Sequence, residues 1–138
     1  MDDAEVAARL RLSATRLARR LRQESTTTGH SPSQLSALAA VFHNGPLTLG
    51  ELAEYERVSP PTITKVAGKL EAEGLIERQA DPRDGRVSRV IATKAGKSLI
   101  LKTRERKTMW LTARVRDLEP ADLERLAAAL DVLDELAR

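Results

Sequence analysis

Short polar and basic side chains gather on one side of a predicted helix near residues 59–73. The apolar residues of this segment recur at the helical period and predict a side that faces the core, namely Ile63, Val66, Ala67 and Leu70. The opposite side and its flanks then display Pro61, Thr62, Thr64, Lys65, Gly68 and Lys69. Hydroxyl groups can bond the phosphates or base edges of a DNA duplex, and ammonium groups neutralise phosphate. The alternative is a plain solvated face, which is the usual meaning of a charged helix surface.

A second group of charged side chains follows this helix. Two short segments of partly alternating polarity predict paired strands, at residues 75–79 and 87–92. In the loop between them an Asp-Gly pair at Asp84 marks a turn, and Arg83 and Arg86 flank its tip. A guanidinium on a protruding hairpin suits the minor groove of DNA, whose negative potential attracts it. A charged turn alone is usually only a turn, but directly after a polar-faced helix it predicts a wing.

Local start and stop signals place these elements. Thr48 with Glu51 forms a capping box for a first helix. Ser59 before Pro60 begins the second helix, because the serine oxygen accepts a free backbone N–H and proline lacks the donor that would be stranded. Only a short turn fits between the two helices, which is the spacing of a helix-turn-helix. Gly74 ends the second helix, since glycine readily adopts the left-handed conformation.

The N-terminal segment predicts a helix from Glu5 to Glu24 with one apolar stripe. Six arginines crowd its other sides, with no acidic residue among them. These arginines can contact nucleic acid, form ion pairs across a subunit interface or remain solvated. A linker is expected from Glu24 to Gly29, and Ser31 begins a further helix that ends near Asn44.

The C-terminal segment predicts a pair of helices. Thr93 can cap the first, from about residue 95 to residue 115, and Trp110 on this helix is expected in the core, or alternatively in the wall of a small-molecule pocket. Glu119 begins the second helix, whose leucines alternate between three- and four-residue spacing in a short coiled-coil seam. Such a seam needs partners. The simplest architecture packs both terminal helices against their copies in a second subunit.

Composition limits the classes of protein that the chain can represent. The 138 residues are 41% hydrophobic and 31% charged, which predicts one domain, or a small core with helical extensions. Aromatic residues make up only 2%, so the core must be built from aliphatic side chains. The chain has no cysteine, and two histidines are too few for a convincing metal site. We find no nucleophile–base set or phosphate loop and expect no enzyme and no cofactor. Without a long apolar run, we expect a cytoplasmic protein with no membrane partner.

The segment from Leu70 to Arg86 combines two motifs. Its first half has the pattern LE..GLI.R, from Leu70 to Arg78, and its second half has the wing pattern D.RD.R, from Asp81 to Arg86. In carrying both, which few other winged helices do, the chain resembles the MarR family of winged helix-turn-helix transcription regulators, and the likeness extends over nearly its whole length. It implies a mainly α fold with a small antiparallel β-hairpin wing and a helical dimerisation region. The implied parts are a dimerisation helix and linker (1–30), a winged unit (31–94, core 47–94) and dimerisation helices (95–138).

The resemblance also implies a function. Such proteins are homodimeric, sequence-specific DNA-binding transcription regulators, usually repressors, that bind palindromic operators in double-stranded DNA. A recognition helix (about 59–73) would enter the major groove through Ser59, Pro61, Thr62, Thr64, Lys65 and Lys69. The wing (about 80–87) would enter the minor groove, most directly through Arg86, with Arg83 and Asp84 shaping it through an ion pair or touching the DNA backbone.

The resemblance further implies a small-molecule effector and a subunit interface. Small, often aromatic, anionic ligands release such repressors from DNA when they bind between the dimer helices and the winged unit, and Arg16, His43 and Trp110 are the expected lining residues. The expected dimer contacts are Leu10, Leu17, Leu123, Leu126, Leu130 and Leu133.

The chain departs from the family pattern in three respects. Lys65 stands where arginine or histidine is more usual, which weakens bidentate reading of a base because an ammonium is a point charge. Gly68 costs about 1 kcal/mol relative to alanine inside a helix, and it either permits close backbone approach to DNA or is simply tolerated. The lack of cysteine excludes the thiol-oxidation branch of the family. The alternative functions are sequence-tolerant or architectural DNA binding, and a winged-helix protein-interaction module.

Overall fold

The computed structural model describes residues 1–25 and 29–138. Its elements are α1 (Asp3–Ser25), α2 (Pro32–Asn44), α3 (Leu49–Glu56), α4 (Pro60–Ala72), β1 (Ile76–Ala80), β2 (Ser88–Ala92), α5 (Lys94–Arg116) and α6 (Pro120–Leu136). Within the described residues, six helices and a two-stranded antiparallel hairpin confirm the predicted mainly α fold with a β-hairpin wing. No helix in this part of the chain is long and apolar enough to cross a membrane.

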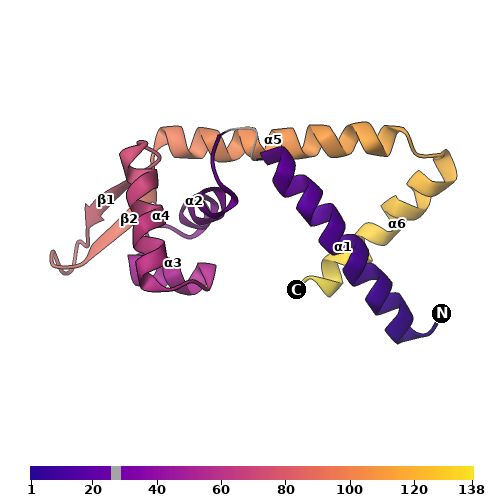
Figure 1. Ribbon diagram of the computed structural model, residues 1–138, viewed down its shortest axis with the longest axis horizontal. Helices are drawn as coiled ribbons and strands as arrows, with labels where there is room; N and C mark the ends of the chain where they lie inside the picture. The colour runs from indigo at the N-terminus through magenta and orange to yellow at the C-terminus, as the bar shows by residue number, and fades with distance from the viewer. Residues whose placement is uncertain (26–28) are drawn as a thin grey trace.

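The helices are arranged around α5, which runs along one side of the molecule (Figure 1). The elements α2, α3, α4 and the hairpin form a compact winged unit at the N-terminal end of α5. The C-terminal end of α1 contacts the middle of α5, and α6 folds back from the C-terminal end of α5. The two terminal helices therefore project away from the winged unit.

Side-chain caps begin the helices where the sequence predicts them. Ser31 Oγ accepts the backbone N–H of Gln34, whose side chain accepts the N–H of Ser31 in return. Thr48 and Glu51 make the same reciprocal pair at the start of α3. Ser59 caps α4 through the backbone N–H of Thr62. These polar side chains satisfy backbone donors that the first turn of a helix leaves free.

An aliphatic core holds the winged unit together. Its largest fully buried side chains are Leu38, Leu52, Ile63, Leu70, Ile76, Val41 and Val90. They come from α2, α3, α4 and both strands, and Ile100 of α5 completes the cluster. The strands pair from Ile76 opposite Ala92 to Ala80 opposite Ser88, so each begins one residue later than predicted. The core thus fixes α4 and the wing stem to the same framework.

Trp110 does not join this core, contrary to the sequence expectation. It is half-buried on α5, and the guanidinium carbons of Arg20 and Arg114 lie 5.2 Å and 4.6 Å from its ring centroid. Arginine side chains stack favourably on the face of a tryptophan. The ring therefore joins α1 to α5 at the surface.

The terminal helices expose apolar side chains. Helix α6 has no buried residue, and the only one in α1 is Ser25. The exposed residues include Val6, Leu12, Leu17, Leu123, Leu126, Leu130 and Leu136. Helix α1 runs on to Ser25, so the first residues of the predicted linker are helical, and residues 26–28 lie outside the described part of the chain.

The start of α5 is locked to the end of α4. Thr93 Oγ1 accepts the backbone N–H of Gly96, and its hydroxyl donates to the backbone oxygen of Gly74 at 2.6 Å. Gly74 has the left-handed backbone predicted for it, with φ +74°. A Cβ atom at Gly96 would overlap the backbone oxygen of Leu75 and lie 3.1 Å from Leu38 Cδ1. Glycine is thus required where α5 crosses the end of α4.

We expect Gly96→Ala to lower the free energy of unfolding by about 1–3 kcal/mol, the usual cost of overpacking. Gly68→Ala is the matched control, because nothing lies within 4 Å of a Cβ atom at that position. It should raise stability by about 0.5–1 kcal/mol, since alanine favours a helix interior over glycine. Urea unfolding followed by circular dichroism measures both, and equal effects of the two substitutions would contradict the close approach at Gly96.

Candidate nucleic-acid interface

Helix α4 separates an apolar back from a polar front. Ile63, Ala67 and Leu70 are buried, and Val66 is half-buried at their edge. The residues predicted to contact DNA are all exposed, namely Ser59, Pro61, Thr62, Thr64, Lys65 and Lys69. Because the apolar back is held by the core, the polar front must face outward.

The hydroxyl groups of this front are already ordered. Ser59 Oγ and Thr62 Oγ1 lie 2.9 Å apart, within hydrogen-bond distance, at the first turn of α4. Thr64 Oγ1 donates to the backbone oxygen of Pro60 at 2.9 Å. A hydroxyl oxygen has two acceptor lone pairs besides its single proton, so each retains capacity for a further bond. The front therefore presents oriented polar groups together with the mobile ammonium groups of Lys65 and Lys69.

The wing tip is shaped by carboxylates. Asp81 Oδ1 accepts the backbone N–H groups of Arg83 at 2.8 Å and Asp84 at 3.3 Å, which closes the turn. Asp84 in turn receives the Arg86 guanidinium, Nε to Oδ1 at 3.0 Å and Nη2 to Oδ2 at 3.2 Å. The Arg86 side chain and backbone bonds lower the pKa of Asp84. The family resemblance implies that Arg83 and Asp84 shape the wing, but the ion pair joins Asp84 to Arg86, while the Arg83 side chain is exposed.

The Arg86 side chain is 91% exposed, the most accessible of the ion-paired groups in the wing. A pair this exposed contributes little to stability. Its guanidinium can therefore exchange Asp84 for another anionic partner at small cost. This property is what a groove contact requires.

Arg89 anchors the wing stem, a role that the sequence did not reveal. Its Nε lies 2.8 Å from Asp81 Oδ2, and its Nη1 lies 2.8 Å from Glu51 Oε1. Glu51 is also the capping-box residue of α3, and its bonds with Thr48 and then with Arg89 lower its pKa. The pKa of Asp81 is lowered first by Arg89 and then by the N–H of Arg83. One guanidinium thus ties the wing turn to the first helix of the helix-turn-helix.

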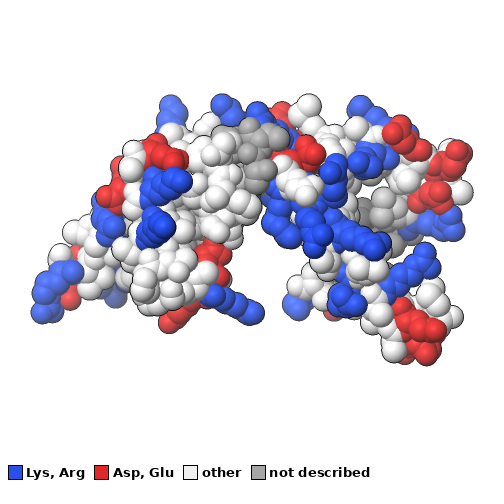
Figure 2. Space-filling model, viewed as in Figure 1, with Lys and Arg blue, Asp and Glu red and all other residues white. Residues whose placement is uncertain are grey.

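Basic side chains concentrate on particular surfaces of the molecule. Figure 2 shows lysine and arginine at the wing tip, over α4, and most densely over α1. Acidic side chains gather at the far end of α1 and near the corner between α5 and α6, and further acidic groups lie at the upper end of α4 and around α3. The polar front of α4 and the wing tip therefore each carry basic side chains suited to a polyanion.

Comparison with known proteins gives the family. The sequence profile of the MarR family matches residues 30–88. A Mycobacterium leprae protein described as an HTH-type transcriptional regulator is 37% identical over 97% of this chain and 94% of its own length. A crystal structure of a Pseudomonas aeruginosa transcriptional regulator superimposes with a TM-score of 0.83 at 35% identity, covering 99% of this chain and 96% of that one. The chain belongs to the MarR family.

This MarR protein is therefore a helix-turn-helix transcription regulator that binds DNA. A further relative, the Bacillus subtilis transcriptional repressor MdtR, is 37% identical over 49% of this chain and 44% of its own length. That shorter match covers only part of the chain. The profile match spans the helix-turn-helix and most of the wing, so it includes the residues that form the polar front.

The expected effector residues do not meet at one cavity. Arg16 is exposed on α1, and His43 is exposed at the end of α2, where it contacts Arg104. Trp110 lies further along α5 with its two arginines. None of the three borders the cavity of about 240 Å³ between α1, α2 and α5, which we call the basic cavity. Its lining is Arg22, Ser25, Pro32, Leu35, Ser36, Ala39, Ile100, Thr103, Arg104 and Lys107.

We expect Arg89→Gln to loosen the wing and to weaken DNA binding about fivefold. The substitution breaks both partly exposed ion pairs of Arg89, the one with Asp81 and the one with Glu51. The ¹H–¹⁵N heteronuclear NOE values of residues 81–87 should fall. Arg78→Gln is the control, since Arg78 pairs with Glu71 on α4 and makes no bond to the wing tip. Unchanged NOE values in Arg89→Gln would contradict the anchor.

The same anchor should depend on pH. The pKa values of Asp81 and Glu51 are lowered in the folded protein, so their stabilising effect is complete above their ordinary values and is lost as pH falls through the lowered ones. Below roughly pH 4, the wild-type wing should therefore approach the mobility of Arg89→Gln at neutral pH.

Proposed function

We propose that this protein is a homodimeric repressor that binds a palindromic operator through α4 in the major groove and the wing in the minor groove. The observation that carries the proposal is the exposed polar front of α4, whose apolar back packs into the core through Ile63, Ala67 and Leu70. A recognition helix must present its side chains to bases without burying them in its own domain. The Bacillus subtilis relative MdtR is a transcriptional repressor, which supports repression rather than activation.

The contacts on α4 divide by chemistry. Lys65 and Lys69 are placed to neutralise phosphate, and the hydroxyls of Ser59, Thr62 and Thr64 to bond phosphate or base edges. Gly68 lies among them with open space where a Cβ atom would be. In this arrangement the glycine allows the helix backbone to approach the duplex closely. Arg86 at the wing tip is the proposed minor-groove contact, with Arg83 beside it.

Exposed faces on the terminal helices support a dimer. Leu17, Leu123, Leu126 and Leu130 are exposed here, whereas Leu10 and Leu133 are half-buried. The arginine-rich side of α1 is also complementary in charge to α6, which carries Asp122, Glu124, Asp131, Asp134 and Glu135. We propose that residues 1–30 and 95–138 form the subunit interface and 31–94 the DNA-reading unit. A two-fold dimer would offer paired recognition helices to paired half-sites.

Selection of bound duplexes from a random pool of DNA sequences tests this function. Purified protein should enrich a palindrome with half-site centres about 10 base pairs apart from random duplex DNA at fixed salt. Arg86→Ala should weaken binding roughly tenfold, about 1.4 kcal/mol. Arg83→Ala serves as the matched wing variant. Arg78→Ala is the control, because Arg78 pairs with Glu71 on α4 and makes no bond to the wing tip. A sequence-tolerant or architectural protein would retain duplex without enrichment, and a protein-interaction module would retain none.

We further propose that a small aromatic anion binds in the basic cavity and thereby causes the protein to release its operator. Arg22, Arg104 and Lys107 bring positive charge to a space between the winged unit and the terminal helices. An occupant there would bias the separation of the recognition helices, provided that it binds one arrangement better than the other. Thr103 adds a hydroxyl to the same wall.

Benzoate is a suitable probe of this release. It should dissociate the protein from the selected operator, and Arg104→Gln should raise the concentration required roughly tenfold, because a charge-assisted hydrogen bond is lost. Lys102→Gln, an exposed α5 residue outside the cavity, is the control for net charge. Equal sensitivity of the two variants would place the effect outside the basic cavity.

A further inference from the structure

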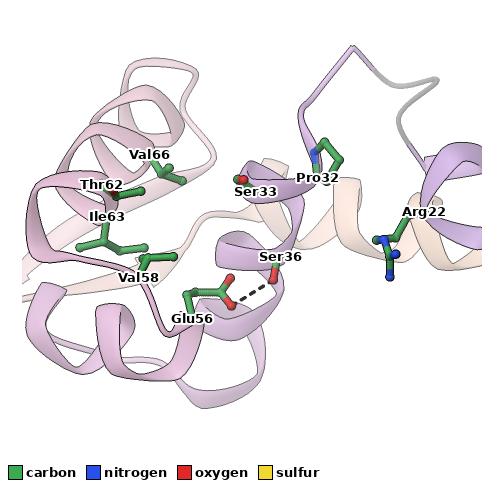
Figure 3. Close-up of a pocket in the computed structure, with 9 residues that line it drawn as sticks. All are labelled: Arg22, Pro32, Ser33, Ser36, Glu56, Val58, Thr62, Ile63 and Val66. Carbon is green, nitrogen blue, oxygen red and sulfur yellow. Dashed lines mark hydrogen bonds between the residues drawn. The ribbon is translucent and has the colours of Figure 1, made fainter. Parts of the chain in front are cut away.

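A separate cavity lies behind the recognition helix. It has a volume of about 260 Å³ and lies between α2, the turn that joins α3 to α4, and the first turns of α4 (Figure 3). Its lining is Arg22, Pro32, Ser33, Ser36, Glu56, Val58, Thr62, Ile63 and Val66. We call it the Glu56 cavity. It borders the basic cavity at Arg22, Pro32 and Ser36 but faces α3 and α4 instead of α5.

The carboxylate of Glu56 is only half satisfied. Ser36 Oγ donates to Glu56 Oε2 at 3.0 Å. The other oxygen, Oε1, is buried and has no hydrogen-bond partner among the described residues. Buried polar atoms in folded proteins nearly always have a partner, so such an atom requires an explanation. A carboxylate only accepts hydrogen bonds, and the strongest donors to it are cationic N–H groups.

The remaining walls of the Glu56 cavity indicate the chemical character of the rest of the ligand. Val58, Ile63 and Val66 form an apolar side, and Figure 3 shows them facing Ser33 and Ser36 across the space, with Glu56 at one end. Arg22 lies on the far side of the α2 segment from the valines in the same view. An apolar wall with a single acidic end matches a small molecule with an apolar body and one cationic donor.

We infer that the Glu56 cavity binds a small organic ammonium ion, with its N–H groups on Glu56 and its apolar body against Val58, Ile63 and Val66. This goes beyond the proposed operator binding and its release by anions, and it concerns a ligand of opposite charge at a different place. Thr62 both lines this cavity and belongs to the polar front. An occupant therefore touches the recognition helix directly.

The test uses direct binding and does not depend on an operator. We would titrate the full chain with 2-phenylethylammonium at pH 7, following methyl chemical shifts by NMR. The neutral 2-phenylethanol and the anionic phenylacetate carry the same ring and are the matched probes. The ammonium should shift the methyl signals of Val58, Ile63 and Val66, and both analogues should bind roughly tenfold more weakly.

Matched variants test whether the Glu56 carboxylate is the group that binds the ammonium probe. Glu56→Gln keeps the size of the side chain and should weaken 2-phenylethylammonium binding roughly tenfold. Glu54→Gln removes an exposed acid from the same helix and should leave binding unchanged. Thermal unfolding establishes that each variant is folded. Should Glu56→Gln unfold, Val58→Phe decides, because Val58 is 39% exposed and can accept a larger ring that narrows the cavity and weakens binding.

Four results would overturn the inference. Equal binding of the three probes would make the site a simple apolar groove. Equal losses in Glu54→Gln and Glu56→Gln would show non-specific attraction to negative charge. Shifts confined to Leu35 and Ile100 would place the probe in the basic cavity. No binding at all would show that the unpartnered Glu56 Oε1 does not mark a ligand site.

Discussion

The burial of the back of α4 is the constraint on which the rest of the structure depends. Ile63, Ala67 and Leu70 insert between α2, α3 and β1 in a core without a fully buried aromatic ring. Such burial removes apolar surface from water and fixes the rotation of the helix about its axis. Once that rotation is fixed, the hydroxyl and ammonium groups on the opposite side of α4 must point toward solvent. The outward direction of the polar front is therefore a consequence of how the core holds this helix.

Helix α5 carries that orientation to the terminal helices. Its first turns belong to the core of the winged unit through Ile100, and its later turns contact α1 through the stacking of Arg20 on Trp110. The close passage of Gly96 over the backbone of Leu75 leaves little room for rocking at the junction. A long helix shared in this way transmits a change at one end as a displacement at the other. The proposed subunit interface and the proposed DNA-contacting front of α4 are thus connected through one helix.

The sequence predicted what depends on local chemistry. Capping boxes at Ser31 and Thr48, the proline start of α4 and the glycine after it all involve residues within a few positions of one another, so spacing alone reveals them. Arg89 was missed because its partners lie 8 and 38 residues away, and only the folded hairpin brings them together. Trp110 was misplaced because an apolar pattern does not show that arginines cover the ring. The family resemblance implied a ligand site between the dimer helices and the winged unit, where the basic cavity lies, but named other lining residues. The Glu56 cavity was not predicted, because cavities have no spacing rule.

The pair of cavities gives α2 a particular importance. Its first turns border both, with positive groups on the side of α5 and the Glu56 carboxylate on the side of α3. The start of the same helix is linked to the end of α4, because Glu73 lies 3.0 Å from His30 and accepts from Gln34 at 3.5 Å. A displacement of α2 by an occupant of either cavity would therefore reach the recognition helix by the same route. Coupling between binding sites is reciprocal, so ligands of opposite charge that act through α2 would each change the affinity of the other and of DNA.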